Sequence, residues 1–159
     1  MVDERSFRGL MSCFATGVTV MTAHDPKLGP VGITINSMTS VSLKPPLVLF
    51  CLEKKAHLYP VFARATHFAV NILADTQENV SRYFADYRHH KKPEKLWAKP
   101  KKNCPLLQGT LGWAVCRKVA SYKGGDHTIF LGEVLELHRR SGQSKPLLYF
   151  HSRYKRISR

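Results

Sequence analysis

Residues 32–52, GITINSMTSVSLKPPLVLFCL, decide the fold class of this chain. The first part, residues 32–42, predicts an extended segment with an unusual share of Thr, Ser and Asn. Pro45 and Pro46 exclude a helix across the middle, because a residue that precedes proline is pushed out of the helical region. Residues 47–52 (LVLFCL) form a short apolar run that predicts a buried strand. Two extended segments with no helix between them favour a β-rich protein.

The segments on either side continue this pattern. Further strands are predicted at residues 18–23, 67–73, 110–121, 127–137 and 147–150. Helices are predicted at residues 4–16, 60–64 and 75–85, the first with Asp3 as N-cap, Gly17 at its end and an apolar stripe of Phe7, Leu10, Met11 and Phe14. Few strands are joined by crossovers of the length that a parallel sheet needs. We therefore expect a mainly β protein, an antiparallel barrel with helices at its margins, formed as one domain over residues 1–159.

The amino-acid composition says more about the possible binding partners than about the fold. The 159 residues include 25 Lys and Arg against 11 Asp and Glu, a formal net charge of +14 that would attract nucleic acid, anionic lipid or phosphate-bearing cofactors. No secretory signal and no apolar run long enough to cross a bilayer is visible, so we expect a cytoplasmic protein without a membrane partner. The four cysteines do not have the spacing of zinc ligands, so we expect reduced thiols and no metal site: Cys13, Cys51, Cys104 and Cys116.

Several catalytic motifs are missing from the sequence. It contains no G-x-S-x-G, no H-E-x-x-H, no G-x-x-x-x-G-K and no G-x-G-x-x-G. A Rossmann nucleotide site is therefore not expected, and a nicotinamide would have to bind in another way.

Three segments carry groups that a ligand site could use, and each also has a plain structural explanation. Thr34–Ser42 offers short hydroxyl and amide groups for a ring edge or a phosphate, or it is a polar strand that faces water. His127 follows a Gly-Gly-Asp turn and could face a cleft, or it is an incidental residue of that turn. Residues 147–154 (LLYFHSRY) end the chain with aromatic residues and a histidine, or they are simply a closing strand.

Residues 86–103 (DYRHHKKPEKLWAKPKKN) form the most basic part of the chain. They predict an exposed, charged loop, placed over an anionic pocket if it has a role. The alternative is a contact with nucleic acid, since Tyr87 and Trp97 lie among the lysines and arginines.

Taken together, these segments resemble the short-chain flavin reductases of two-component monooxygenases. The matching pieces stand in the order of that family and cover nearly the whole chain, at residues 7–23, 32–52, 67–85, 124–134 and 146–154. The resemblance implies an FMN-binding split β-barrel that forms a homodimer. It also implies FMN or FAD as the flavin, NADH or NADPH as the hydride donor and a separate monooxygenase as the recipient of reduced flavin.

The same resemblance implies roles for individual residues. It assigns His127 to the nicotinamide as the catalytic position, with Tyr149 shaping that site. It assigns the remaining contacts to the flavin ring, its phosphate-bearing chain and the pocket wall, partly through backbone groups: Thr34, Asn36, Ser37, Ser40, Phe50, Cys51 and Leu52. His57 is a departure, because the family often has a small hydroxyl residue there, although a cationic histidine also suits an anion.

The predicted activity is an NAD(P)H:flavin oxidoreductase. Hydride transfer between two cofactors needs little acid–base chemistry from the protein, which agrees with the absence of paired carboxylates or an activated nucleophile. Two alternatives stay open: a flavin-carrying electron-transfer protein without reductase turnover, and a non-enzymatic nucleic-acid binder that uses residues 86–103.

Overall fold

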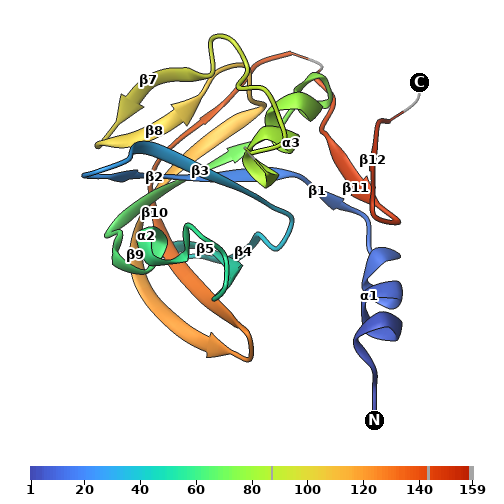
Figure 1. Ribbon diagram of the computed structural model, residues 1–159. Helices are drawn as coiled ribbons and strands as arrows, with labels where there is room; N and C mark the ends of the chain where they lie inside the picture. The colour runs from blue at the N-terminus through green and yellow to red at the C-terminus, as the bar shows by residue number, and fades with distance from the viewer. Residues whose placement is uncertain (87, 143, 158–159) are drawn as a thin grey trace.

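The computed structural model describes residues 1–86, 88–142 and 144–157 (Figure 1). Its main body is a seven-stranded antiparallel sheet with the spatial order β3 (Gly29–Ile35), β2 (Thr19–Asp25), β6 (His67–Ile72), β9 (Gly112–Gly124), β10 (His127–Arg139), β5 (Pro46–Glu53) and β4 (Thr39–Leu43). Smaller elements flank it: the hairpin β7 (Trp97–Lys101) and β8 (Cys104–Leu107), and the sheet of β1 (Thr16–Gly17), β11 (Leu148–Phe150) and β12 (Arg153–Lys155). The helices are α1 (Glu4–Ser12), α2 (Tyr59–Arg64) and α3 (Glu78–Ala85), the last preceded by the 3₁₀ turn η1 (Asp75–Gln77).

The connection between β3 and β4 makes the sheet curl into a barrel. These two strands form opposite edges of the sheet, yet only residues 36–38 separate them in the chain. The two edges must therefore approach each other. The long strands β9 and β10 also curve the sheet. Their pairing shifts register between Leu131 and Gly132 and again between Val134 and Glu136, and such bulges bend a sheet. The prediction of a mainly β, antiparallel barrel is confirmed.

Aromatic side chains fill the barrel. The Phe50 ring lies 5.1 Å from the ring centroids of both Phe68 and Phe130 and 5.9 Å from that of Phe62, which α2 contributes. All four side chains are at most 2% exposed. Each such ring buries 150–250 Å² of surface, so this cluster is the main source of hydrophobic stabilisation on the β5 side.

A second cluster fixes α3 against the other edge of the barrel. Phe84 of α3 packs over β2 and β3 in a core with Val20, Leu73 and Leu147. Gly32 makes this packing possible: a Cβ at that position would stand 2.7 Å from Cε1 of Phe84. Thr34 adds a hydrogen bond, donating its hydroxyl to the Ser81 carbonyl at 2.6 Å. The C-terminal end of α3 is thereby held beside the end of β3.

The first helix and the polar stretch differ from the sequence-based predictions. α1 begins after Asp3, which accepts from Ser6 N at 2.9 Å as expected, but it ends at Ser12, and Gly17 belongs to β1 instead of capping the helix. Its apolar stripe is exposed; in Figure 1, α1 projects from the barrel. The single extended segment predicted for residues 32–42 is two strands, because the chain must pass from one edge of the barrel to the other at residues 36–38.

The basic segment is also more ordered than predicted. Within residues 86–103 the chain forms β7, which pairs with β8, a strand that the sequence analysis did not assign. The predicted final strand is the first half of a hairpin, in which Tyr149 pairs with Tyr154. Tyr87, named for the nucleic-acid alternative, lies outside the described residues.

Two further predictions concern the state of the cysteines and the presence of membrane-spanning segments. All four cysteines are free, and burial raises the pKa of Cys51 and brings that of Cys104 to about 11 and that of Cys116 to about 12. These three thiols are therefore protonated at neutral pH. Within the described part of the chain, no helix has the length and apolar character needed to cross a membrane.

Candidate flavin site

The crossing between β3 and β4 is pinned to the neighbouring strand. The Ser37 hydroxyl donates to the Cys51 carbonyl at 2.8 Å and accepts from the Cys51 N–H at 3.2 Å. One side chain thus replaces the strand pairing that is interrupted at residues 36–38. Asn36, next to it, is exposed. The crossing therefore presents an amide side chain to solvent from a fixed backbone.

Two adjoining cavities open beside this crossing. A cavity of about 210 Å³ is lined by Thr34, Asn36 and Tyr149 together with apolar residues and Tyr154. A second cavity of about 350 Å³ lies between β3, the end of α3 and the turn after β5; it is lined by Ile33, Lys55, Ala56, His57, Leu58, Phe84, Ala85, Asp86 and Arg88. Ala85 lines both cavities, so the two are neighbours.

A third cavity extends the site along the C-terminal hairpin. It measures about 410 Å³ and shares Ala85, Tyr149 and Tyr154 with the first. Arg82, His90 and Arg153 supply its basic side. The Arg82 guanidinium lies 4.9 Å from the centroid of the Tyr154 ring, and the Tyr154 hydroxyl is 2.8 Å from that of Ser81. The tyrosine is therefore held from both sides at the junction of the two cavities.

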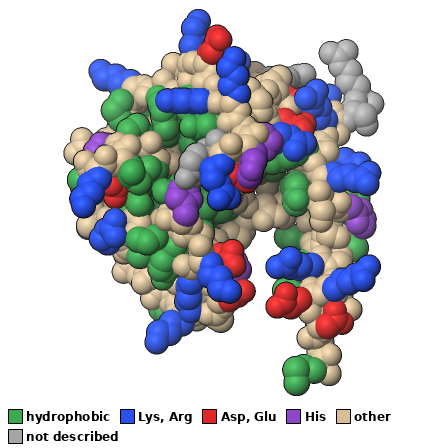
Figure 2. Space-filling model, viewed as in Figure 1, with side chains coloured by type: hydrophobic (Ala, Val, Ile, Leu, Met, Phe, Trp, Pro, Cys, Tyr) green, Lys and Arg blue, Asp and Glu red, His purple; other side chains and the backbone are tan. Residues whose placement is uncertain are grey.

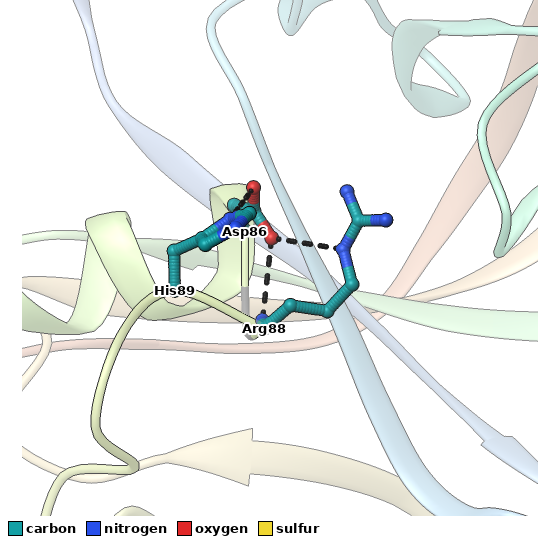
Figure 3. Close-up of polar contacts among 3 residues, drawn as sticks. All are labelled: Asp86, Arg88 and His89. Carbon is teal, nitrogen blue, oxygen red and sulfur yellow. Dashed lines mark hydrogen bonds and ion pairs between the residues drawn. The ribbon is translucent and has the colours of Figure 1, made fainter.

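Asp86 organises the chain where α3 ends (Figure 3). Its Oδ1 accepts from Arg88 N at 3.2 Å and from Arg88 Nε at 3.3 Å, and its Oδ2 lies 2.6 Å from His89 Nδ1. The hydrogen bond with His89, followed by those with Arg88, lowers the pKa of Asp86 to about 2. Asp86 is thus ionised at neutral pH and holds Arg88 at the cavity. Its contribution to this local order is full above the ordinary carboxyl pKa and disappears as the pH falls towards 2.

The charge around these cavities suits a phosphorylated aromatic ligand. Lys55, His57 and Arg88 line the second cavity with Asp86 as its single acid, the third cavity adds Glu78 paired with Arg82 at 2.7 Å, and Tyr149 and Tyr154 offer aromatic faces. Lys and Arg side chains outnumber acids over the face seen in Figure 2. Cationic groups bind phosphate and aromatic faces stack on planar rings, so the residues present fit a flavin nucleotide.

The structure brings some of the predicted site residues together and separates others. Thr34, Asn36 and Tyr149 line one cavity and His57 the adjoining one. Ser37 and Cys51 form the pinned crossing, and Ser40 is exposed on β4. Phe50 and Leu52 belong to the core, 1% and 3% exposed, and are not among the residues that line the cavities beside the crossing, which corrects their assignment to the pocket wall. His127 is not among the residues that line the cavities beside the crossing.

Several polar and charged residues that line these cavities were not predicted: Lys55, Glu78, Arg82, Asp86, Arg88, His90, Ser152, Arg153 and Tyr154. Lys55 lies two residues before the predicted His57, and Tyr154 ends the segment 147–154, so closeness in sequence to a predicted residue or segment is the signal that could have found both. Asp86 and Arg88 belong to the basic segment, in which the sequence shows no difference between solvated charges and those that face a cavity.

The fold and these cavities define a flavin-binding oxidoreductase. The model of the flavin reductase like domain matches residues 11–158. This chain belongs to the flavin reductase family, and the predicted resemblance and enzyme class are confirmed.

Relatives of known name agree with this assignment. The FMN reductase (NADH) SmoA of Agrobacterium fabrum is 42% identical over 158 residues, which cover 99% of this chain and 88% of the relative. The reductase component of the flavin-dependent trigonelline monooxygenase of Acinetobacter baylyi is 40% identical over 82% of this chain, which spans only 42% of that relative. The NADH:FAD oxidoreductase of Streptomyces globisporus, solved with NAD and FAD fragments, has a TM-score of 0.90 at 37% identity, covering 99% of this chain and 96% of the other.

Proposed function

We propose that this protein reduces FMN or FAD with NADH or NADPH and passes the reduced flavin to a separate monooxygenase. The observation that carries the proposal is the group of three neighbouring cavities between β3, α3 and the C-terminal hairpin, with aromatic walls and a basic rim. Relatives named as reductase components of monooxygenases support the recipient.

The chain's own residues bind the flavin and set its orientation. Asn36 and the backbone of the pinned crossing would hydrogen-bond the edge of the flavin ring, and Tyr149, which lines the same cavity as Asn36, would cover its face. Lys55, His57 and Arg88 are placed to neutralise its phosphate. The bound flavin supplies the hydride-accepting chemistry, so the protein's task is to set distance and stacking.

Steady-state assays test this proposal against both alternatives. Purified protein should oxidise many molecules of NADH or NADPH per molecule of protein when FMN or FAD is added in molar excess over the protein. An electron-transfer protein would reduce bound flavin once without turnover. A nucleic-acid binder would show neither reaction and would bind DNA or RNA with a steep salt dependence. Absence of flavin-dependent NAD(P)H oxidation by folded protein would contradict the proposal.

We further propose a two-fold homodimer. The support is the N-terminal segment: Phe7 and Leu10 of α1 and Phe14, two residues after its end, are 55%, 69% and 67% exposed, and no residue of α1 is buried. A stripe of this kind on a projecting helix is typical of an interaction surface. Light scattering at micromolar concentration should give twice the chain mass, and Leu10→Lys should shift it towards the monomer. Gly9→Lys, in the same helix, is the control. A monomeric parent with flavin present would contradict the proposal.

His127 is proposed to position the nicotinamide. It begins β10 opposite Glu53, is 43% exposed in its side chain, and its Nδ1 lies 2.8 Å from Asp126 Oδ1. His127→Ala should raise the apparent KM for NADH by about ten-fold, the value of one lost hydrogen bond of about 1.4 kcal/mol, and leave flavin affinity unchanged. Stopped-flow reduction across NADH concentrations measures this. His138→Ala, on the same strand, is the control; unchanged NADH dependence in folded His127→Ala would refute the role.

A cytoplasmic location stays a prediction. It is supported by the four free cysteines, as expected in a reducing compartment. The nucleic-acid alternative is less favoured, because Arg88 faces the flavin cavity and Lys101 is 3.4 Å from Glu136.

A further inference from the structure

A second groove lies at the opposite end of β3 from Asn36. It consists of two adjoining chambers, which share His24 and Asn103. The first, about 480 Å³, is walled by Trp97, Ala98 and three prolines, Pro30, Pro100 and Pro105. The second, about 660 Å³, carries the charged residues Asp25, Arg64 and Lys102. We call these two chambers the distal groove.

The apolar chamber has the form of a ring-binding site. The Trp97 ring is held by Phe84, at 5.7 Å between centroids and 65° between planes, and the Trp97 carbonyl accepts from Gln108 Nε2 at 3.0 Å. Proline rings add flat, rigid apolar surface with little entropy to lose on binding. The volume lies within the range of small-molecule sites, and a planar aromatic ring matches these walls.

The polar chamber adds a selective charge. Asp25 is already engaged: its Oδ1 accepts from Lys27 N and Leu28 N at 2.9 and 3.1 Å, and its Oδ2 from Arg64 at 3.4 Å. Arg64 and Lys102 stand against the one carboxylate of Asp25, so these three side chains leave one formal positive charge. A monoanion balances that charge, whereas a dianion would also meet the Asp25 carboxylate.

Lys102 occupies an unusual backbone position for its side chain. Lys102 and Asn103, with φ of 46° and 60°, form the two-residue turn between Lys101 and Cys104. Turns with positive φ at both central residues favour glycine and asparagine, and a lysine there is uncommon. The strained position places a cation in the polar chamber.

We propose that the distal groove binds a small aromatic carboxylate, with the ring against Trp97 and the prolines and the carboxylate towards Lys102 and Arg64. This site is separate from the proposed flavin cavities and does not depend on them. Trp97 contacts Phe84, which lines the cavity that holds Arg88 and His57, so the two sites share a packing contact but none of their lining residues.

Tryptophan fluorescence tests the proposal with benzoate as the probe. Trp97 and Trp113 are the two tryptophans of the chain, so Trp113→Phe leaves Trp97 as the reporter. Benzoate should change this fluorescence with saturation, and neutral benzamide should bind more weakly. Equal binding of both compounds, or no saturable change in the folded protein, would overturn the proposal.

Two lysine substitutions make a matched pair. Lys102→Gly removes the charge and relieves the positive φ, so the variant should fold, while Lys95→Gly does the same at another lysine with φ of 47° that does not line the groove. Lys102→Gly should weaken benzoate binding by up to about five-fold, the scale of one exposed ion pair, and Lys95→Gly should not. Equal affinities in the two variants would overturn the role of Lys102.

Calorimetry with saturating FMN separates this site from the flavin site. Benzoate should bind equally well with and without FMN. Loss of benzoate binding when FMN is present would place the aromatic acid in the flavin cavity and overturn the proposal, without bearing on flavin reduction itself. Tighter binding of AMP than of benzoate at the distal groove would also overturn it, since the occupant would then be a nucleotide.

Discussion

Replacing Asn71 with alanine is expected to lower the free energy of unfolding by about 3 kcal/mol, as a broken network of buried hydrogen bonds does. Asn71 is fully buried on β6. Its amide donates to the Val20 carbonyl and to the Thr22 hydroxyl, both at 3.0 Å, and its Oδ1 accepts from Leu107 N at 2.9 Å. Alanine would leave the Leu107 N–H without its acceptor in the interior and open a cavity beside β8.

Urea unfolding at neutral pH measures this loss. Asn79→Ala on the exposed side of α3 is the control, and it should change stability by less than about 0.5 kcal/mol, as surface substitutions do. An Asn71→Ala protein as stable as the Asn79→Ala control would mean that β8 is held by its apolar side chains alone.

This network also shows why the sequence could not yield the whole fold. Thr22 donates to the Pro105 carbonyl and Asn71 accepts from Leu107, so β8 is attached to β2 and β6 by side chains that lie 83 and 36 residues away in the chain. The local periodicity of the sequence does not predict contacts between residues that lie so far apart in the chain. By contrast, β9 and β10 were predicted, at residues 110–121 and 127–137, on either side of the Gly-Gly-Asp turn that joins them, because a hairpin is determined locally.

The site divides in the same way. The polar segment of residues 34–42 stands out in the sequence by its share of Thr, Ser and Asn, but the crossing at residues 36–38 within it was not predicted. Arg88 does not stand out, because it is one of several cations in residues 86–103 and only the end of α3 and Asp86 decide that it lines a cavity. The exposed stripe of α1 is a related case: its periodicity predicts a helix correctly but cannot tell whether the apolar side meets the same chain or another.

Asn36→Ala should weaken flavin binding by about ten-fold, which corresponds to about 1.4 kcal/mol for one hydrogen bond to the flavin. Asn36 is exposed at the crossing and lines the cavity shared with Thr34 and Tyr149, so its truncation removes a ligand contact without opening the core. The backbone there should keep its place, because Ser37 holds it to Cys51 through both the carbonyl and the N–H. Fluorescence titration with FMN and with FAD measures the change.

Two serine substitutions on β4 separate the loss of a flavin contact from a general effect of substitution on the strand. Ser40→Ala is expected to weaken flavin binding as Asn36→Ala does, whereas Ser42→Ala, on the same strand, should not, since the Ser42 hydroxyl already accepts from Lys44 N at 3.2 Å. If Asn36→Ala and Ser40→Ala both bind FMN and FAD as tightly as the parent, the flavin does not lie along the crossing. Flavin titration of Arg88→Gln would then test whether the basic cavity of Lys55, His57 and Arg88 binds the flavin phosphate.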